Sequence, residues 1–271
     1  MRKIFISLCL LLSLALSMKA QEPKDIMKDP IPVAMFQATY AFHLPAFDNK
    51  ALYSFSHNVG GGFAYKTASN WLFGVNANYI FGNHLNVDRV EIFGEGITTD
   101  VGEIVGGDGR YATLEVGQRG LHVQAQVGKV FAMGPNPNCG IFVQGGVGYL
   151  YNRIRVAYSQ ILQNPPHQVD HDYQYGYDRM RGGPALHLEG GYLYLSDTRL
   201  LNASLSLEVT YAPTHDLRDY DFRVFTNPET GVMEPVGRTD PHKIYHDFYY
   251  GIRFTWSIPT YQRKPADYYI Y

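Results

Sequence analysis

Apolar and polar side chains alternate along residues 201–212, LNASLSLEVTYA. Leu205, Leu207 and Val209 belong to one set, and Ser206 and Glu208 belong to the other. Because successive side chains of a β-strand point to opposite faces, this pattern predicts a strand with one apolar and one polar face. The stretch is about as long as a tilted strand that crosses a bilayer. If its apolar face meets lipid, its polar face lines the interior of a barrel.

The same alternation recurs along the chain and predicts eight strands in total. In the third of them, Trp71, Phe73 and Val75 alternate with Gly74 and Asn76. Aromatic residues lie near both ends of this stretch, as expected at two membrane interfaces. Residues 111–116 are expected to prolong the fourth strand beyond the membrane. The predicted strands cover residues 33–43, 58–66, 71–82, 121–131, 139–152, 185–195, 201–212 and 245–257.

The connections between these strands are alternately long and short. The first, third, fifth and seventh are long, whereas the second, fourth and sixth are turns such as MGPNPN at 133–138. Transmembrane barrels have short periplasmic turns and long extracellular loops. We therefore predict an all-β fold, a closed antiparallel up-and-down transmembrane β-barrel of eight strands. A soluble β-sandwich is the alternative that alternation alone permits.

The N-terminus has a basic start, an apolar core over residues 4–16 and small residues near Ala20, which together predict a cleaved export signal at 1–20. We expect a periplasmic lead-in at 21–31, the outer-membrane barrel at 32–258 and a periplasmic tail at 259–271. After cleavage one cysteine remains, Cys139, so no internal disulfide is expected. The 22 Tyr, 15 Phe and 27 Gly suit a barrel with aromatic belts, and a net charge of −2 gives no reason to expect nucleic acid as a partner.

This architecture resembles the small eight-stranded outer-membrane barrels, the family of OmpX and of the OmpA membrane domain. The likeness covers nearly the whole mature chain. Three segments, at 176–195, at 256–261 (WSIPTY) and at 267–271 (DYYIY), are similar to uncharacterised outer-membrane barrel proteins of Bacteroidota. The resemblance implies an outer-membrane location and brings no known activity with it.

Three charged residues, Glu189, Glu208 and Arg253, fall on the polar faces of the last three predicted strands. Counted from the same end of each strand, they lie near one level. Two carboxylates beside a guanidinium would form a charge-assisted network inside the barrel. Because eight strands leave room only for side chains, we interpret the three as a plug that fills the lumen. A gate or a proton-linked site is the functional alternative.

Two groups of imidazoles and carboxylates combine residue types that bind transition metals but match no recognised ligand motif. We therefore expect no metal and no cofactor. The groups are His167, Asp170, His171 and Asp172 in the third long connection, and Asp240, His242, His246 and Asp247 at the end of the fourth.

Ser56 and His57 come nearest to a catalytic pair, but adjacent strand residues point to opposite faces. The chain also lacks the His-x-Ser pattern of barrel lipid A deacylases, so a lipid-modifying enzyme is the weakest alternative. Tyr177 and Arg181, with other aromatic and arginine residues of the long connections, suit either a protein contact surface or a lid over the barrel rim. We expect a non-enzymatic structural or interaction module surrounded by outer-membrane lipid. The alternatives are an accessory subunit of a secretion or barrel-assembly complex, with an outer-membrane or periplasmic protein partner bound through loops or tail, and a narrow pore.

Overall fold

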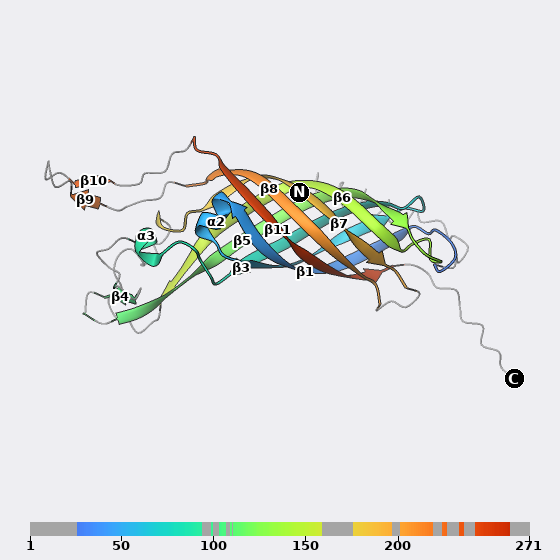
Figure 1. Cartoon of the computed structure of the whole chain (residues 1–271), viewed down its shortest axis with the longest axis horizontal. Helices are drawn as coiled ribbons and strands as arrows, with labels where there is room; N and C mark the ends of the chain where they lie inside the picture. Colours follow the sequence, from blue (N-terminus) through green and yellow to red (C-terminus); the bar gives the residue numbers. More distant parts are fainter. Residues whose placement is uncertain are drawn as a thin grey trace, which may run out of the picture.

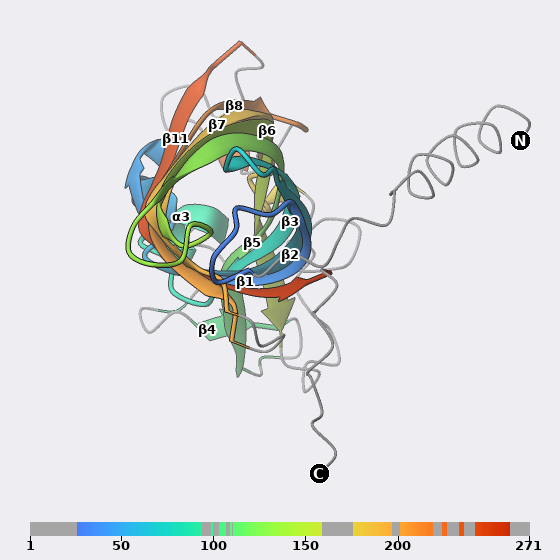
Figure 2. The ribbon, with the colours of Figure 1, turned by 90° about the vertical axis from the view of Figure 1, so that its right-hand side faces the viewer.

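Eight long strands form one antiparallel ring (Figure 1; Figure 2). The computed structural model describes residues 26–93, 99, 103–106, 109, 111–158, 176–196, 201–218, 224–226, 233–235 and 242–260. Pairing of β1 with β11 and of β3 with β5 closes the ring. The predicted fold class, a closed up-and-down β-barrel, is thereby confirmed. Its strands are β1 (Val33–Phe47), β2 (Ser56–Lys66), β3 (Trp71–Gly82), β5 (Tyr111–Ala132), β6 (Gly140–Tyr158), β7 (Arg181–Tyr194), β8 (Ala203–Asp216) and β11 (Tyr245–Pro259).

Short elements lie in the connections between the barrel strands. α2 (Asp48–Leu52) follows β1, and α3 (Arg89–Phe93) and β4 (Glu103–Val105) lie between β3 and β5. β9 (Val224–Thr226) pairs with β10 (Met233–Pro235). The connections 67–70, 133–139 and 195–202 share one end of the barrel, called the turn end, and the opposite end is called the loop end. The turn end is on the right in Figure 1 and faces the viewer in Figure 2. Among the described residues, no helix is long and apolar enough to cross a membrane.

The barrel is apolar outside and polar inside. On β8, Leu205 and Leu207 are 60% and 68% exposed, whereas Ser206 and Glu208 are 3% and 2% exposed. The other strands repeat this arrangement, with exposed Phe, Tyr, Val and Ile residues outside and buried Asn, Gln, Ser, Thr and His residues inside. A soluble sandwich would bury its apolar faces between two sheets, so that alternative is excluded. Transmembrane barrels have this inverted polarity because lipid surrounds their wall.

Several strands are longer than predicted. β5 runs without a break from Tyr111 to Ala132, in agreement with the expected extension at 111–116, and β6 pairs with it as far as Tyr158. Residues 44–47 of β1 still pair with β11 after the pairing with β2 has ended at His43. Pro45, which has no N–H to donate, falls in this stretch, where one edge of β1 has no strand beside it. The first connection, predicted at 44–57, is therefore only 48–55 and no longer than the turn at 195–202.

Candidate functional site in the barrel lumen

Glu189 on β7 and Glu208 on β8 are direct neighbours across the antiparallel ladder. Both side chains point into the lumen and are buried, at 3% and 2% exposure. Two carboxylates placed opposite each other on adjacent strands repel, and burial away from water strengthens this repulsion. The pair therefore needs compensating partners inside the barrel.

Glu208 receives such partners from two other strands. Arg253 on β11 donates a hydrogen bond from Nε to Oε2 at 2.5 Å. His43 on β1 contacts the second carboxylate oxygen, Oε1, through Nε2 at 2.5 Å. Both residues are 2% exposed. Charge-assisted hydrogen bonds are the strong ones, and here they join three neighbouring strands at one level of the lumen.

Glu189 is held by neutral donors. Ser206 Oγ donates to Oε1 at 2.6 Å, and Gln144 Nε2 donates to Oε2 at 2.7 Å. Ser206 also lies directly across the ladder from Arg253, so the guanidinium and the second carboxylate belong to one cluster. Glu189 and Arg253 also line the same small cavity in the lumen.

His187 lies between the two carboxylates. Its Nε2 is 3.5 Å from Glu189 Oε2 and 3.6 Å from Glu208 Oε2. Its other nitrogen, Nδ1, shares a hydrogen bond of 2.9 Å with Thr210 Oγ1. The cluster thus combines two carboxylates, one guanidinium and two imidazoles within contact of one another.

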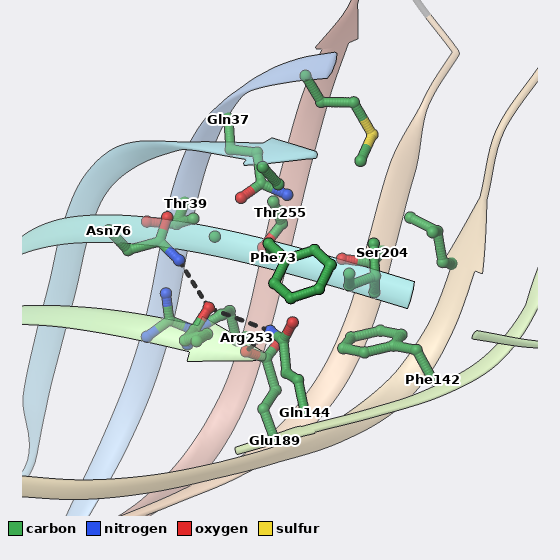
Figure 3. A pocket seen from close by; sticks show the side chains of 16 residues that line it. Gln37, Thr39, Phe73, Asn76, Phe142, Gln144, Glu189, Ser204, Arg253 and Thr255 are labelled. Atoms are coloured by element: carbon green, nitrogen blue, oxygen red, sulfur yellow. Dashed lines mark hydrogen bonds between the residues drawn. The ribbon is translucent and has the colours of Figure 1, made fainter. Parts of the chain in front are cut away.

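Neutral amides continue the network around the barrel (Figure 3). Gln144 on β6 donates to Gln126 Oε1 on β5 at 3.3 Å, and Asn76 on β3 donates to the same oxygen at 2.8 Å. A cavity of about 30 Å³ remains beside Glu189 and Arg253. This volume is enough for a water molecule or two and for nothing larger. The lumen at this level is therefore filled by hydrogen-bonded side chains.

In the middle of β2, glycines leave space in the lumen in place of side chains. A Cβ added to Gly62 would lie 1.9 Å from Asn76 Oδ1, and one added to Gly60 would lie 2.2 Å from Asn78 Oδ1. Glycine at these two positions lets the asparagines of β3 turn into the lumen. The amide of Asn76 then reaches Gln126, and the amide oxygen of Asn78 accepts a hydrogen bond from Thr39 on β1.

His187, Glu189 and Glu208 are a set of described residues that could hold a metal ion, with one ligand atom of each within 4.8 Å of the others. The Glu208 oxygen nearest His187 is, however, the one that accepts the hydrogen bond from Arg253. A guanidinium in contact with a ligand carboxylate opposes a second cation at that place. The geometry therefore favours an ion-pair network over a metal centre.

Residues 26–31, here called the turn-end seal, pack against inward-facing residues at the turn end of the barrel. Asn138 holds them, because its Nδ2 donates to the carbonyl oxygens of Ile26 and Asp29 at 2.7 Å each and its Oδ1 accepts from the Ile31 N–H at 3.0 Å. Buried Lys66 donates to Ile31 O at 3.1 Å and to Asn138 Oδ1 at 2.7 Å. Ile26 and Ile31 also belong to an apolar cluster with inward-facing residues of the strands. The described part of the predicted lead-in thus packs against the barrel.

A second apolar cluster, here called the loop-end cap, covers the loop end. It includes Tyr53, Phe93 of α3 and Tyr177, and the rings of Phe93 and Tyr177 are 5.6 Å apart. In Figure 2, α3 is seen through the ring at its far end. Next to Tyr177, the Asp178 carboxylate is 3.5 Å from Arg218. Burial raises the pKa of Asp178 to about 6, although the Arg218 charge acts in the opposite direction. For Tyr177, these contacts favour the lid over an open contact surface.

The other residues considered from the sequence do not converge on a site. Ser56 is buried in the lumen, whereas His57 lies on the outer face and shares a hydrogen bond of 2.8 Å with Tyr40. His246 is exposed, and Asp247 is buried and accepts a hydrogen bond from Thr214. His242 is exposed. His167, Asp170, His171, Asp172 and Asp240 lie outside the described residues.

The structure brings Glu189, Glu208 and Arg253 to one level of the lumen, and their role as a plug stays a prediction. Sequence reasoning did not include His43 and His187 in this network. Alternation places both on the inner face, but their level depends on the register between strands.

The fold and the lumen define a class: a closed eight-stranded β-barrel with a lipid-type outer face and a filled polar interior. No family model and no curated protein sequence matches the chain. Solved structures with a similar fold are small outer-membrane barrels, which agrees with the resemblance stated from the sequence. The resemblance to Bacteroidota proteins stays a prediction.

Three of these structures illustrate the likeness. The attachment invasion locus protein Ail of Yersinia pestis, in complex with the heparin analogue sucrose octasulfate, is 8% identical, with a TM-score of 0.39 and coverage of 84% of this chain and 99% of that chain. Neisserial surface protein A is 10% identical, with a TM-score of 0.38 and coverage of 83% and 96%. The outer-membrane protein OprG from Pseudomonas aeruginosa is 15% identical, with a TM-score of 0.35 and coverage of 86% and 99%. At these TM-scores nothing about binding or activity follows for this chain.

Proposed function

We propose that this protein is a non-enzymatic integral outer-membrane β-barrel that is closed to solutes and presents its loop end to the outside of the cell. The inverted polarity supports the membrane location, because Leu205, Leu207 and the apolar residues around them would otherwise face water. A closed ring also pairs its backbone groups within the wall, as lipid requires. Short connections at the turn end are typical of the periplasmic side.

The filled lumen is the main support for the proposal that the barrel is closed to solutes. The cavity that Glu189 and Arg253 line measures about 30 Å³. The turn-end seal packs at one mouth of the barrel, and the loop-end cap packs at the other. A conducting pore needs a continuous path for water and ions, so these features weigh against the narrow pore that the sequence left open. What remains for such a barrel is a structural or interaction role at the membrane surface.

Recruitment into a larger secretion or barrel-assembly complex would use the loops or the tail. Residues 219–223, 227–232, 236–241 and 261–271 lie outside the described part of the chain, so this alternative stays a prediction. Crosslinking in intact cells, followed by copurification in mild detergent, tests it directly.

Reconstitution into planar lipid bilayers tests the closed barrel. We expect no discrete conductance steps from the wild-type protein. Flotation of proteoliposomes shows that the protein has inserted, and a known porin shows that the bilayer detects open channels. Regular steps from the wild-type protein would refute the closed state. Recovery of the mature chain from the periplasm as a detergent-free soluble protein would refute the membrane location.

A further inference from the structure

The turn-end seal, residues 26–31, is attached to the barrel by few groups. In the described part of the chain, no backbone–backbone hydrogen bond joins it to a barrel strand. Ile26 and Ile31 are its buried apolar anchors, whereas residues 27–30 between them are exposed. Segments with few buried contacts and little backbone pairing open more easily than the core of a protein. The seal therefore has the features of a segment that detaches while the barrel stays folded.

Asn138 attaches the seal at three points. Its side chain is 0% exposed and lies in the turn at 133–139. Its Nδ2 donates to the carbonyl oxygens of Ile26 and Asp29 at 2.7 Å each, and its Oδ1 accepts from the Ile31 N–H at 3.0 Å. Without this side chain, three backbone groups of the seal would lose their partner, and such a loss is costly for buried groups. Asn138 therefore holds the seal in place.

Lys66 acts in the opposite direction. Its ammonium is fully buried and donates to Asn138 Oδ1 at 2.7 Å, to Ile31 O at 3.1 Å and to Thr67 O at 3.4 Å. All three acceptors are neutral, and Lys66 forms no ion pair with any residue that the structure describes. An ammonium kept from water without a carboxylate loses more hydration energy than hydrogen bonds to neutral oxygens return. The docked seal thus carries the cost of a buried, unpaired charge.

We propose that the turn-end seal is a detachable strap, which Asn138 holds on the barrel and which hydration of the Lys66 ammonium drives off. Release uncovers the apolar cluster to which Ile26 and Ile31 belong. Leu72 and Phe142 of that cluster also line the small cavity in the lumen, so the seal controls access to this cavity from the turn end. The inference goes beyond the proposed closed barrel, because it makes one end of the barrel a regulated opening.

Cys139 is a native reporter of this release. It is 3% exposed, follows Asn138 directly in the sequence and belongs to the same apolar cluster as the two anchors of the seal. It is also the one cysteine outside the predicted export signal. We expect a maleimide to reach this thiol only after the seal has left. The rate of labelling then measures the released fraction of the protein.

Labelling of the purified protein in detergent tests the proposal. Asn138→Ala should speed the reaction of Cys139 by about tenfold or more, because three hydrogen bonds are lost. Lys66→Met and Lys66→Gln should each slow it by about tenfold, because a neutral side chain removes the charge that favours release. Trypsin cleavage after exposed Lys28 gives a second measure and should follow the same order.

Three controls accompany the measurement. Lys129→Gln removes another cation at the turn end, one that lies 5.4 Å from the Trp71 ring centre on the outer face, and should leave labelling unchanged. Cys139→Ser should abolish labelling. The shift in gel mobility of the folded barrel verifies that each variant is folded.

Low concentrations of urea separate local release from unfolding. Release of so short a segment exposes little surface, so its rate should change little with urea, whereas global unfolding rises steeply. A labelling rate that rises steeply from the first addition of urea would show that Cys139 is uncovered by unfolding of the barrel, and would refute the detachable seal.

The roles of the two side chains can each be overturned. Unchanged labelling of Asn138→Ala would show that this residue does not hold the seal. Faster labelling of both Lys66 variants, with folded barrels, would make Lys66 a lock and refute its role in release, and unchanged labelling of both would refute it as well. None of these outcomes bears on the closed barrel, which the bilayer measurement tests separately.

Discussion

Replacement of Arg253 by methionine should strongly destabilise the barrel. Arg253 is 2% exposed and donates to Glu208, and Glu208 lies opposite Glu189 on the neighbouring strand. Methionine fills part of the volume but supplies no charge, so two buried carboxylates lose their guanidinium. Removing one partner of a buried ion pair typically costs about 3–5 kcal/mol. His43 still contacts Glu208 in the variant, so we expect about 3 kcal/mol, the lower end of that range.

Thermal unfolding in detergent, followed by circular dichroism and by the shift in gel mobility of the folded barrel, measures the effect. For a chain of this size, 1 kcal/mol corresponds to roughly 2–4 °C, so the midpoint should fall by roughly 6–12 °C. A variant that melts with the wild-type protein would refute the placement of Arg253 in a buried charge network.

The double variant Arg253→Met, Glu208→Gln separates the charge effect from lost packing. If the penalty arises from an uncompensated carboxylate, removing the Glu208 charge should recover part of it. The loss of stability in the double variant should then be smaller than the two single losses added together, by on the order of 1–3 kcal/mol. Strict additivity would instead assign the destabilisation to packing around the missing side chain.

Four further predictions concern other parts of the molecule. Gly62→Ala should lower stability by about 1–3 kcal/mol through overpacking, whereas Gly145→Ala, whose added Cβ meets nothing closer than 3.8 Å, should not; urea unfolding compares them. Leu207→Arg on the lipid face should cost about 2–4 kcal/mol in bilayers if it lies near the midplane, by the same measurement. Asn138→Ala should free the turn-end seal, seen as faster proteolysis within residues 26–31. The pKa of Asp178 is raised in the folded state, so the protonated carboxyl contributes stability that is lost as the pH rises from 3.8 to about 6. In unfolding curves measured across this pH range, Asp178→Asn should remove that part of the pH dependence of stability.

The ring of strands and the faces of their residues could be predicted because they depend on a local property. A side-chain period of two assigns Glu208 and Arg253 to the inner face, whatever the partner strands are. Exposed Leu205 and Leu207 show that the same rule gave the outer face correctly. The height of a residue along the barrel axis could not be predicted in this way, because it depends on the register of several strand pairs at once. The contact between His43 on β1 and Glu208 on β8 needs the alignment of both strands with β11.

The turn-end seal lies beyond what a sequence pattern can reveal. Residues 26–31 (IMKDPI) were interpreted as part of a lead-in, because so short a stretch shows no alternation that would indicate a packed segment. Their anchor, Asn138, is separated from Ile31 by 107 residues. The length of β6 was missed for a related reason: residues 153–158 were read as part of a long connection, and they pair with the predicted extension of β5 in the structure.

The packing of the lumen limits where this protein can recognise a partner. A barrel of eight strands has an interior just wide enough for side chains, and the polar face that keeps its strands amphipathic must therefore be neutralised inside. The cluster around Glu208 meets this requirement and thereby removes the lumen as a place for a ligand. Specific recognition is left to surfaces outside the ring. Of these, the outer wall at mid-height is apolar, so the loop end is where charge and shape can select a partner.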